Sequence, residues 1–139
     1  MKKLFIAAFI FVSTFTTSTF ADIKMGVILG FTGPIESLTP AMANSAELAF
    51  KEASDSGSLL GGQKISVERA DSTCVDSAAA TAAAEGLVSG GVVAIMGADC
   101  SGVTGAIATN VAVPNGVVMI SPSATVSYTH LTLPTIYSV

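Results

Sequence analysis

The chain has 139 residues and a formal net charge of −4, and half of its residues are hydrophobic while only 12% are charged. Beyond the first apolar run its basic residues are Lys24, Lys51, Lys64 and Arg69, against ten acidic residues. An acidic chain without a basic cluster is a poor partner for nucleic acid or an anionic membrane surface, so both are excluded as expected partners. The length suits one small domain, and the abundance of alanine and valine suits strands that are buried on both faces.

The N-terminus has the pattern of a secretory signal peptide. Lys2 and Lys3 precede an unbroken apolar stretch at residues 4–12, and small residues at 19 and 21 suit signal peptidase. The apolar stretch is too short to span a bilayer, which argues against the alternatives of a membrane anchor or a buried helix. We therefore predict a signal peptide over residues 1–21, cleavage after Ala21 and an exported mature protein, without a lipid anchor because no cysteine lies near the cut.

The first strand-and-helix unit follows directly. Residues 23–29 form an apolar run that predicts a strand, and Gly30 ends it. Thr39 and Pro40 predict the start of a helix, with threonine as the cap and proline in the first turn. The residues expected on the inward face of this helix are Ala46, Ala49, Phe50 and Ala53.

Three further strands and two further helices complete the pattern. Alternating polarity predicts a strand at 64–70, and Asp76 is placed to cap a helix at 77–89. A strand at 92–96, a helix from Ser101 to about Val111, a turn at 114–116 and a strand at 117–120 follow. The residues expected on the inward face of the 77–89 helix are Ala79, Ala82, Ala83 and Leu87.

This alternation predicts an α/β fold, a parallel sheet with helices on both faces. Ligands bind such sheets at the carboxyl ends of the strands. The segments expected at that edge are 30–39, 71–76, 97–101 and 121–125.

Both cysteines, Cys74 and Cys100, fall in these segments. Two cysteines in an exported protein usually pair, and the bridge would stabilise the fold by about 3–4 kcal/mol on the chain-entropy model. The alternative is a pair of free, buried thiols.

Two of these segments have groups that suit a small polar ligand. Ser101 stands at a predicted helix start, where free backbone N–H groups and a hydroxyl favour an anion; equally, Ser101 could be only a cap. The hydroxyls and carbonyls of 121–125 could hold an ammonium or a carboxylate, although such a loop is often just a polar turn.

Signatures of catalysis are missing from the sequence. Neither a three-glycine dinucleotide fingerprint nor a phosphate-binding loop occurs, and Ser101 does not lie in a nucleophile elbow. A nucleophilic Cys100 would need a histidine partner, and the one histidine is His130. We therefore expect no catalytic residues, no cofactor and no metal.

Three stretches, preceded by the signal peptide, carry a resemblance to a known family: IKMGVILGFTGPIESLTPAM, RADSTCVDSAAATAAAEGLVSGGVVAIMGADCSGVT and GVVMISPSAT. Over residues 22–125 the chain resembles the periplasmic leucine/isoleucine/valine-binding proteins, the substrate-binding proteins of branched-chain-type amino-acid ABC transporters. The resemblance implies that this region is part of the N-terminal lobe of a type I periplasmic binding protein, that the exported chain is periplasmic, and that the intact two-lobed protein is a monomer.

The resemblance also implies roles for individual residues. Cys74 and Cys100 would form a disulfide, and Ser101 would help to bind the carboxylate of the ligand. Ser123 and Thr125 would bind its ammonium group. The family often has an aromatic residue in the first loop, where this chain has Leu38.

Residues 126–139 depart from the family pattern. This segment resembles translated sequencing-adapter read-through, and it holds both tyrosines and the one histidine. We expect it to be an artefactual tail; the alternative is a genuine divergent terminus.

The function implied is capture of an amino acid or similar small zwitterion for an inner-membrane ABC permease, by binding and not by catalysis. The alternatives are a periplasmic ligand-sensing domain of a receptor or regulator, and a small hydrolase that uses Ser101 or Cys100. The residues that would select the side chain of the ligand are not identified by these motifs. With one lobe alone, we expect weak or absent ligand binding.

Overall fold

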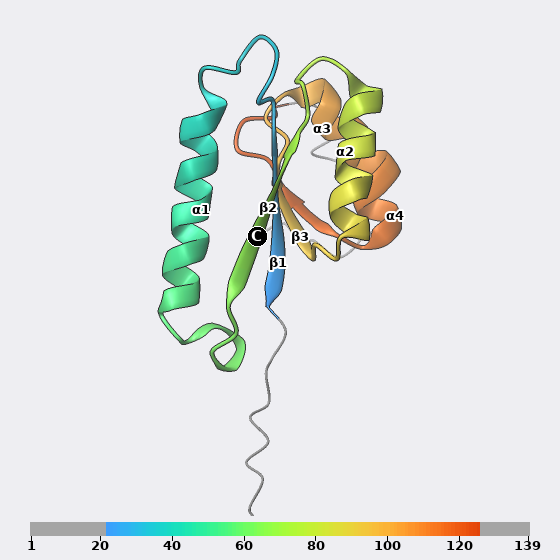
Figure 1. Cartoon of the computed structure of the whole chain (residues 1–139). Helices are drawn as coiled ribbons and strands as arrows, with labels where there is room; N and C mark the ends of the chain where they lie inside the picture. The colour runs from blue at the N-terminus through green and yellow to red at the C-terminus, as the bar shows by residue number, and fades with distance from the viewer. Residues whose placement is uncertain (1–21, 126–139) are drawn as a thin grey trace, which may run out of the picture.

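The computed structural model describes residues 22–125, so the predicted signal peptide and tail lie outside the described residues. One four-stranded parallel sheet in the order β2-β1-β3-β4 forms the centre of this part of the chain (Figure 1). The elements along the chain are β1 (Ile23–Leu29), α1 (Thr39–Asp55), η1 (Leu59–Gly61), β2 (Ile65–Asp71), α2 (Ser77–Ser89), β3 (Ala94–Gly97), α3 (Ser101–Ile107), η2 (Ala108–Ala112), α4 (Val113–Asn115) and β4 (Val118–Ile120).

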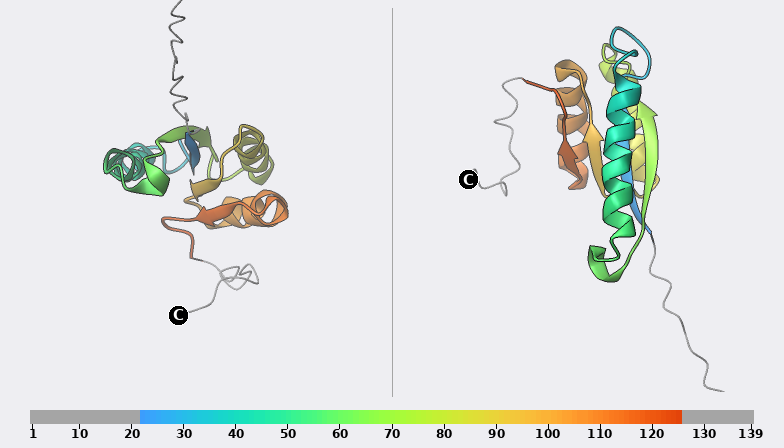
Figure 2. Two further views of the ribbon diagram at one scale, coloured as in Figure 1. Left: turned by 90° about the horizontal axis from the view of Figure 1, so that it is seen from below. Right: turned by 90° about the vertical axis from the view of Figure 1, so that its left-hand side faces the viewer.

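The two faces of the sheet are covered by different helices. α1 lies on one face, and α2 with the helical segment of α3, η2 and α4 lies on the other (Figures 1 and 2). The predicted α/β class, with a parallel sheet and helices on both faces, is therefore confirmed.

Strand β1 contributes to both cores because its side chains alternate between the faces. Val27 and Leu29 pack with Ala43 of α1, whereas Ile28 packs with the residues of α2 and α3. These three β1 side chains are fully buried. A strand buried on both faces explains why residues 23–29 are almost entirely apolar.

The face that carries α1 is only partly covered. An apolar groove of about 140 Å³ lies beside α1 at strands β1, β3 and β4, and it is lined by Met25, Phe50, Ala94, Ile95, Met96, Val118 and Ile120. Val118 and Ile120 are more than half exposed on strand β4.

The helix predictions were right where local chemistry decides them. α2 spans Ser77–Ser89 as predicted, and the Asp76 carboxylate accepts hydrogen bonds from the N–H groups of Ala78 and Ala79 at 2.9 and 3.0 Å. β1 also has its predicted bounds, while β2 and β3 are each displaced by one or two residues toward the C-terminus.

Both predicted helix caps other than Asp76 were wrong. Leu38 occupies the N-cap position of α1, and Thr39 is its first residue, whose hydroxyl donates to the carbonyls of Gly30 and Glu36. Cys100 is the N-cap of α3, so Ser101 is the first helical residue and not a cap.

The predicted inward faces were right only in part. On α1, Ala46 and Phe50 pack against the core, but Ala49 and Ala53 are exposed, and Ala43 is fully buried. On α2, Leu87 is buried and Ala83 packs against the core, but Ala79 and Ala82 are exposed while Ala80 and Ala84 are buried. In both helices, the buried face is therefore rotated about the helix axis relative to the face that was predicted.

The third helix is longer than predicted. Helical structure continues from Ser101 to Asn115 through a π-helical stretch, Ala108–Ala112, and therefore includes Pro114, which was expected in a turn. Proline has no N–H and cannot continue the usual hydrogen-bond pattern, and a wider π turn precedes it here. Gly116, at a φ of 64°, then ends the helix in the left-handed conformation.

Within residues 22–125, none of the helices has the length and apolar character that crossing a membrane requires.

The core makes a direct prediction about stability. Replacing Ile28 with alanine should lower the free energy of unfolding by about 2–5 kcal/mol, because this fully buried side chain fills the core under α2 and α3. The matched control is Leu48→Ala on α1, whose side chain is 57% exposed and whose loss should change stability by about 0.5 kcal/mol or less. Urea unfolding of the two variants measures both values, and equal losses would contradict this account of the core.

Candidate ligand-binding edge

The four predicted loops meet at the carboxyl edge of the sheet. Pairing of the strands places Leu29 beside Asp71 and Ile28 beside Gly97, so β1, β2 and β3 end at the same level. The approach is closest at Gly97, where a Cβ atom would lie 1.9 Å from the carbonyl oxygen of Ile28. We call the loops at this edge loop 1 (30–38), loop 2 (72–76), loop 3 (98–100) and loop 4 (121–125).

A disulfide between Cys74 and Cys100 joins loops 2 and 3, with 5.1 Å between the Cα atoms. The predicted pairing is therefore confirmed, and free thiols are excluded for these two residues. Thr73 and Cys74 both have positive φ values, of 56° and 69°, so the bridge closes on a tightly turned loop 2. Loop 1 lies against the same turn: a Cβ atom on Gly33 would lie 2.5 Å from the carbonyl oxygen of Thr73.

Asp71, at the end of β2, organises loops 1 and 2 through its carboxylate. It accepts hydrogen bonds from the hydroxyl of Thr32 at 2.6 Å, from the N–H of Thr32 at 3.3 Å and from the N–H of Thr73 at 2.8 Å. Burial raises the pKa of Asp71, but these hydrogen bonds and one from the Phe31 N–H outweigh burial and hold that pKa below its usual value.

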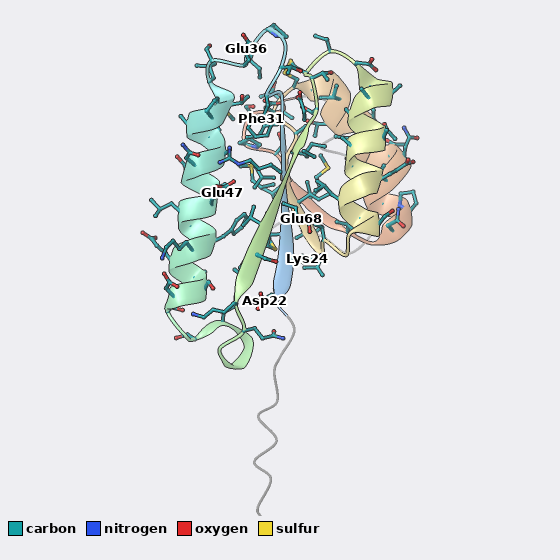
Figure 3. The ribbon with its side chains drawn as sticks, viewed as in Figure 1. Asp22, Lys24, Phe31, Glu36, Glu47 and Glu68 are labelled. Carbon is teal, nitrogen blue, oxygen red and sulfur yellow. A yellow bond between two sulfur atoms is a disulfide. The ribbon has the colours of Figure 1, made fainter. Side chains whose placement is uncertain are left out.

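Phe31 and its neighbours fix the other side of loop 1. The guanidinium of Arg69 lies 5.5 Å from the centre of the Phe31 ring and donates to Glu47 and Asn44 of α1. The hydrogen bond from Arg69 lowers the pKa of Glu47. Figure 3 shows Phe31 and Glu36 toward the loop end of the sheet, whereas Lys24 and Glu68, which form an ion pair of 3.1 Å, lie toward the opposite end.

Asp99 is the buried acid of the edge, with 4% of its surface exposed. One carboxylate oxygen accepts a hydrogen bond from the N–H of Gly30 in loop 1 at 2.9 Å. The other accepts from the N–H of Cys100 at 2.9 Å and, more weakly, from the hydroxyl of Ser72 at 3.4 Å. Asp99 thus contacts loops 1 and 2 from its position in loop 3.

Loop 4 is joined to loop 3 by serine hydroxyls. Ser121 donates to the carbonyl of Ala98, and its oxygen accepts from the N–H of Ala124 at 2.9 Å. Ser123 donates from its hydroxyl to the main-chain carbonyl of Asp99 at 2.7 Å. The hydroxyl of Thr104, in α3, donates to the carbonyls of Ala98 and Cys100.

The three predicted ligand-binding residues lie together at this junction. The N–H of Thr125 donates to the hydroxyl oxygen of Ser101 at 3.2 Å, and Ser123 contacts the residue two positions before Ser101. Leu38, at the position where the resemblance led us to expect an aromatic residue, is 61% exposed immediately before α1.

The hydroxyls of Ser101 and Ser123 are engaged in opposite ways. A serine hydroxyl has one hydrogen to donate and two lone pairs to accept with. In these contacts Ser101 accepts and keeps its hydrogen for another partner, whereas Ser123 donates and keeps its lone pairs. Ser101 therefore suits a negative group, and Ser123 suits a positive one.

Sequence reasoning missed Asp71 and Asp99 as individual residues, although both lie in segments that it placed at this edge. Their signal was an acidic residue at or just after the end of a predicted strand. Within residues 22–125 no cluster of histidine, cysteine, aspartate or glutamate has the arrangement of a metal site.

Comparison with known proteins agrees with this architecture. A model of the periplasmic binding protein family matches residues 22–138. The chain belongs to this family. The match extends into the segment predicted to be an artefactual tail, which lies outside the described residues, so its origin stays a prediction.

The relatives of the chain are branched-chain amino-acid binding proteins. The Leu/Ile/Val-binding protein BraC3 of Rhizobium johnstonii is 33% identical over 105 residues, which cover 76% of this chain and 28% of that protein. The chain thus spans less than a third of the length of this relative.

Two solved structures show the same fold. The substrate-binding protein LivJ of Streptococcus pneumoniae, in complex with isoleucine, is 32% identical with a TM-score of 0.69, over 77% of this chain and 30% of that one. A solute-binding protein of Rhodopseudomonas palustris, in complex with benzoate, is 28% identical with a TM-score of 0.63, over 75% and 28% of the two chains. The described sheet and helices are those of the N-terminal lobe of a type I periplasmic binding protein, as predicted.

The disulfide of this periplasmic binding protein should contribute strongly to its stability. Replacing both Cys74 and Cys100 with serine should lower the free energy of unfolding by about 3.5 kcal/mol, because the bridge closes a loop with a sequence separation of 26. Urea unfolding of the oxidised wild type and the double variant measures the loss. Reduction of the wild type should reproduce it, and a loss below about 1 kcal/mol would contradict the prediction.

The Asp71 network should make stability depend on pH. A carboxyl group whose pKa is lowered by folding stabilises the protein above its normal pKa, and this contribution is lost as the pH falls through the folded value. Asp71→Asn should therefore cost about 1–2 kcal/mol at neutral pH and progressively less below about pH 4. Urea unfolding at neutral pH and again below about pH 4 measures this cost. The control is Asp22→Asn, at an exposed residue before β1. A cost for Asp71→Asn that does not change with pH would refute the role of its ionisation.

Proposed function

We propose that this chain provides the N-terminal lobe of an exported protein that binds an α-amino acid in the periplasm and delivers it to an ABC permease of the inner membrane. The family match and the relatives named for leucine, isoleucine and valine binding support the ligand class. The predicted signal peptide supports the location.

The opposite engagement of two neighbouring hydroxyls carries this proposal. Ser101 retains a hydrogen to donate and Ser123 retains lone pairs to accept with, at one edge of the sheet. A zwitterion presents a carboxylate and an ammonium on adjacent carbon atoms, so it needs a donor and an acceptor close together. Hydrogen bonds with charged groups are also stronger than those between neutral groups.

Binding follows from these contacts. The ligand carboxylate accepts from the hydroxyl of Ser101, and its ammonium donates to oxygen atoms of Ser123 and Thr125. The amino-acid side chain points away from loops 3 and 4 toward the second lobe of the complete protein. Closure of that lobe removes the pair of charges from water and strengthens both contacts. Binding without chemical change is sufficient for this role.

A second ligand class is favoured by one comparison. The Rhodopseudomonas palustris protein was solved with benzoate, a carboxylate that has no ammonium group. Such a ligand would use Ser101 in the same way and leave Ser123 and Thr125 without an ionic partner. Competition between leucine and benzoate separates the two classes.

Titration of the ¹⁵N-labelled oxidised chain with leucine tests the proposal. One lobe supplies only part of the contacts, so the dissociation constant should lie in the millimolar range, with shifts confined to the amides of Ser101, Ser123 and Thr125. Ser101→Ala should weaken binding about tenfold, because a hydrogen bond to the carboxylate is lost. The control Ser89→Ala, exposed at the far end of α2, should have no effect. Micromolar affinity would contradict the need for a second lobe, and shifts at other sites would refute the assigned residues.

A further inference from the structure

We propose that Asp99 is a positioning residue of the ligand-binding edge: its carboxylate holds loop 1 against loop 3 and thereby fixes how Ser101 and Ser123 face a common ligand. This inference rests on the proposed function for its consequence, but its geometry can be tested independently.

The position of Asp99 connects it to every loop of the edge. Its side chain accepts from Gly30 of loop 1 and Ser72 of loop 2, and its main-chain carbonyl accepts from Ser123 of loop 4 at 2.7 Å. It precedes Cys100, which is bonded to loop 2 through the disulfide. Both the side chain and the main chain of one residue therefore set the positions of the other three loops.

The contacts require a carboxylate specifically. Each of its two oxygens accepts from a backbone N–H, one from Gly30 and one from Cys100, both at 2.9 Å. An asparagine has one oxygen and one NH₂ group, so one of those N–H donors would face another donor. At a site with only 4% exposure, water cannot freely replace the lost acceptor. An isosteric replacement therefore cannot preserve this arrangement.

Movement of Asp99 would directly shift the residues that are proposed to bind the ligand. Its carbonyl holds the Ser123 hydroxyl, and Ser101 lies two residues further along the same backbone. The oxygen of Ser101 in turn accepts from the N–H of Thr125. A change at Asp99 therefore alters the spacing of the donor and acceptor that a zwitterion must match.

The test compares Asp99→Asn with the wild type by NMR on the oxidised full chain. We expect amide hydrogen exchange at Gly30 to become at least tenfold faster, the Thr125 amide signal to shift, and the dissociation constant for leucine to rise about tenfold. A direct measurement needs no variant: a scalar coupling across the hydrogen bond should join the Gly30 nitrogen to the Asp99 carboxyl carbon. If Asp99→Asn does not fold, this coupling decides the geometry, and its absence overturns the inference.

Two controls separate positioning from general stability. Val27→Ala creates a defect in the α1 core and should lower the melting temperature without moving the Thr125 signal or changing the leucine affinity. Ser72→Ala removes only the weaker contact at 3.4 Å and should leave Gly30 exchange unchanged.

The possible results distinguish failure of the proposed role of Asp99 from failure of the proposed function. Unchanged Gly30 exchange and unchanged leucine affinity in Asp99→Asn would overturn the role of Asp99, as would an affinity loss that Val27→Ala matches. If leucine shifts no edge amide in the wild type, the proposed function fails, while the exchange and coupling measurements still decide whether Asp99 positions the loops.

Discussion

Everything at the carboxyl edge depends on the pairing of β1 with β2 on one side and with β3 on the other. The register places Leu29 beside Asp71 and Ile28 beside Gly97, so three loops leave the sheet at one level. That register is held by burial, since Ile28 faces one core while Val27 and Leu29 face the other. A slip of one residue would exchange these faces and separate the loops, so the hydrophobic cores determine the geometry of the polar edge.

The edge is polar, yet two of its acids, Asp71 and Asp99, are engaged by the protein itself. The oxygens of Asp71 and Asp99 accept from main-chain N–H groups and hydroxyls of the surrounding loops. These carboxylates therefore act as internal supports, and the hydroxyls of Ser101 and Ser123 remain to meet a ligand. Under the proposed function, this arrangement would let an acidic edge accept a carboxylate-bearing molecule, because Asp71 and Asp99 turn their oxygens toward protein donors while Ser101 would offer a hydrogen.

Sequence reasoning succeeded where neighbouring residues decide the outcome and failed where distant ones do. Asp76 caps α2 because its carboxylate reaches N–H groups two and three residues ahead, and so the bounds of α2 were predicted correctly. The buried stripe of that helix was predicted poorly, because the sheet and not the helix decides whether Ala79 or Ala80 faces inward. Ser101 and the 121–125 loop were candidates from the local sequence, and the family resemblance assigned the roles of Ser101, Ser123 and Thr125. The role of Asp99 was not foreseeable, because its partner Gly30 lies 69 residues away in the sequence.

The disulfide and the Asp99 carboxylate constrain loop 3 in complementary ways. Cys100 ties this loop covalently to loop 2, while the adjacent Asp99 ties it to loop 1 by the hydrogen bond from the Gly30 N–H. A single disulfide limits the distance between two loops but leaves rotation about the bridge, whereas the hydrogen bond from the Gly30 N–H to the Asp99 carboxylate is directional. The bridge limits the distance between loops 2 and 3, and the Asp99 carboxylate sets the orientation of loop 3. Together they define the position of Ser101, the residue after Cys100. Loss of the bridge should therefore act first on stability, and loss of the carboxylate should act first on ligand recognition.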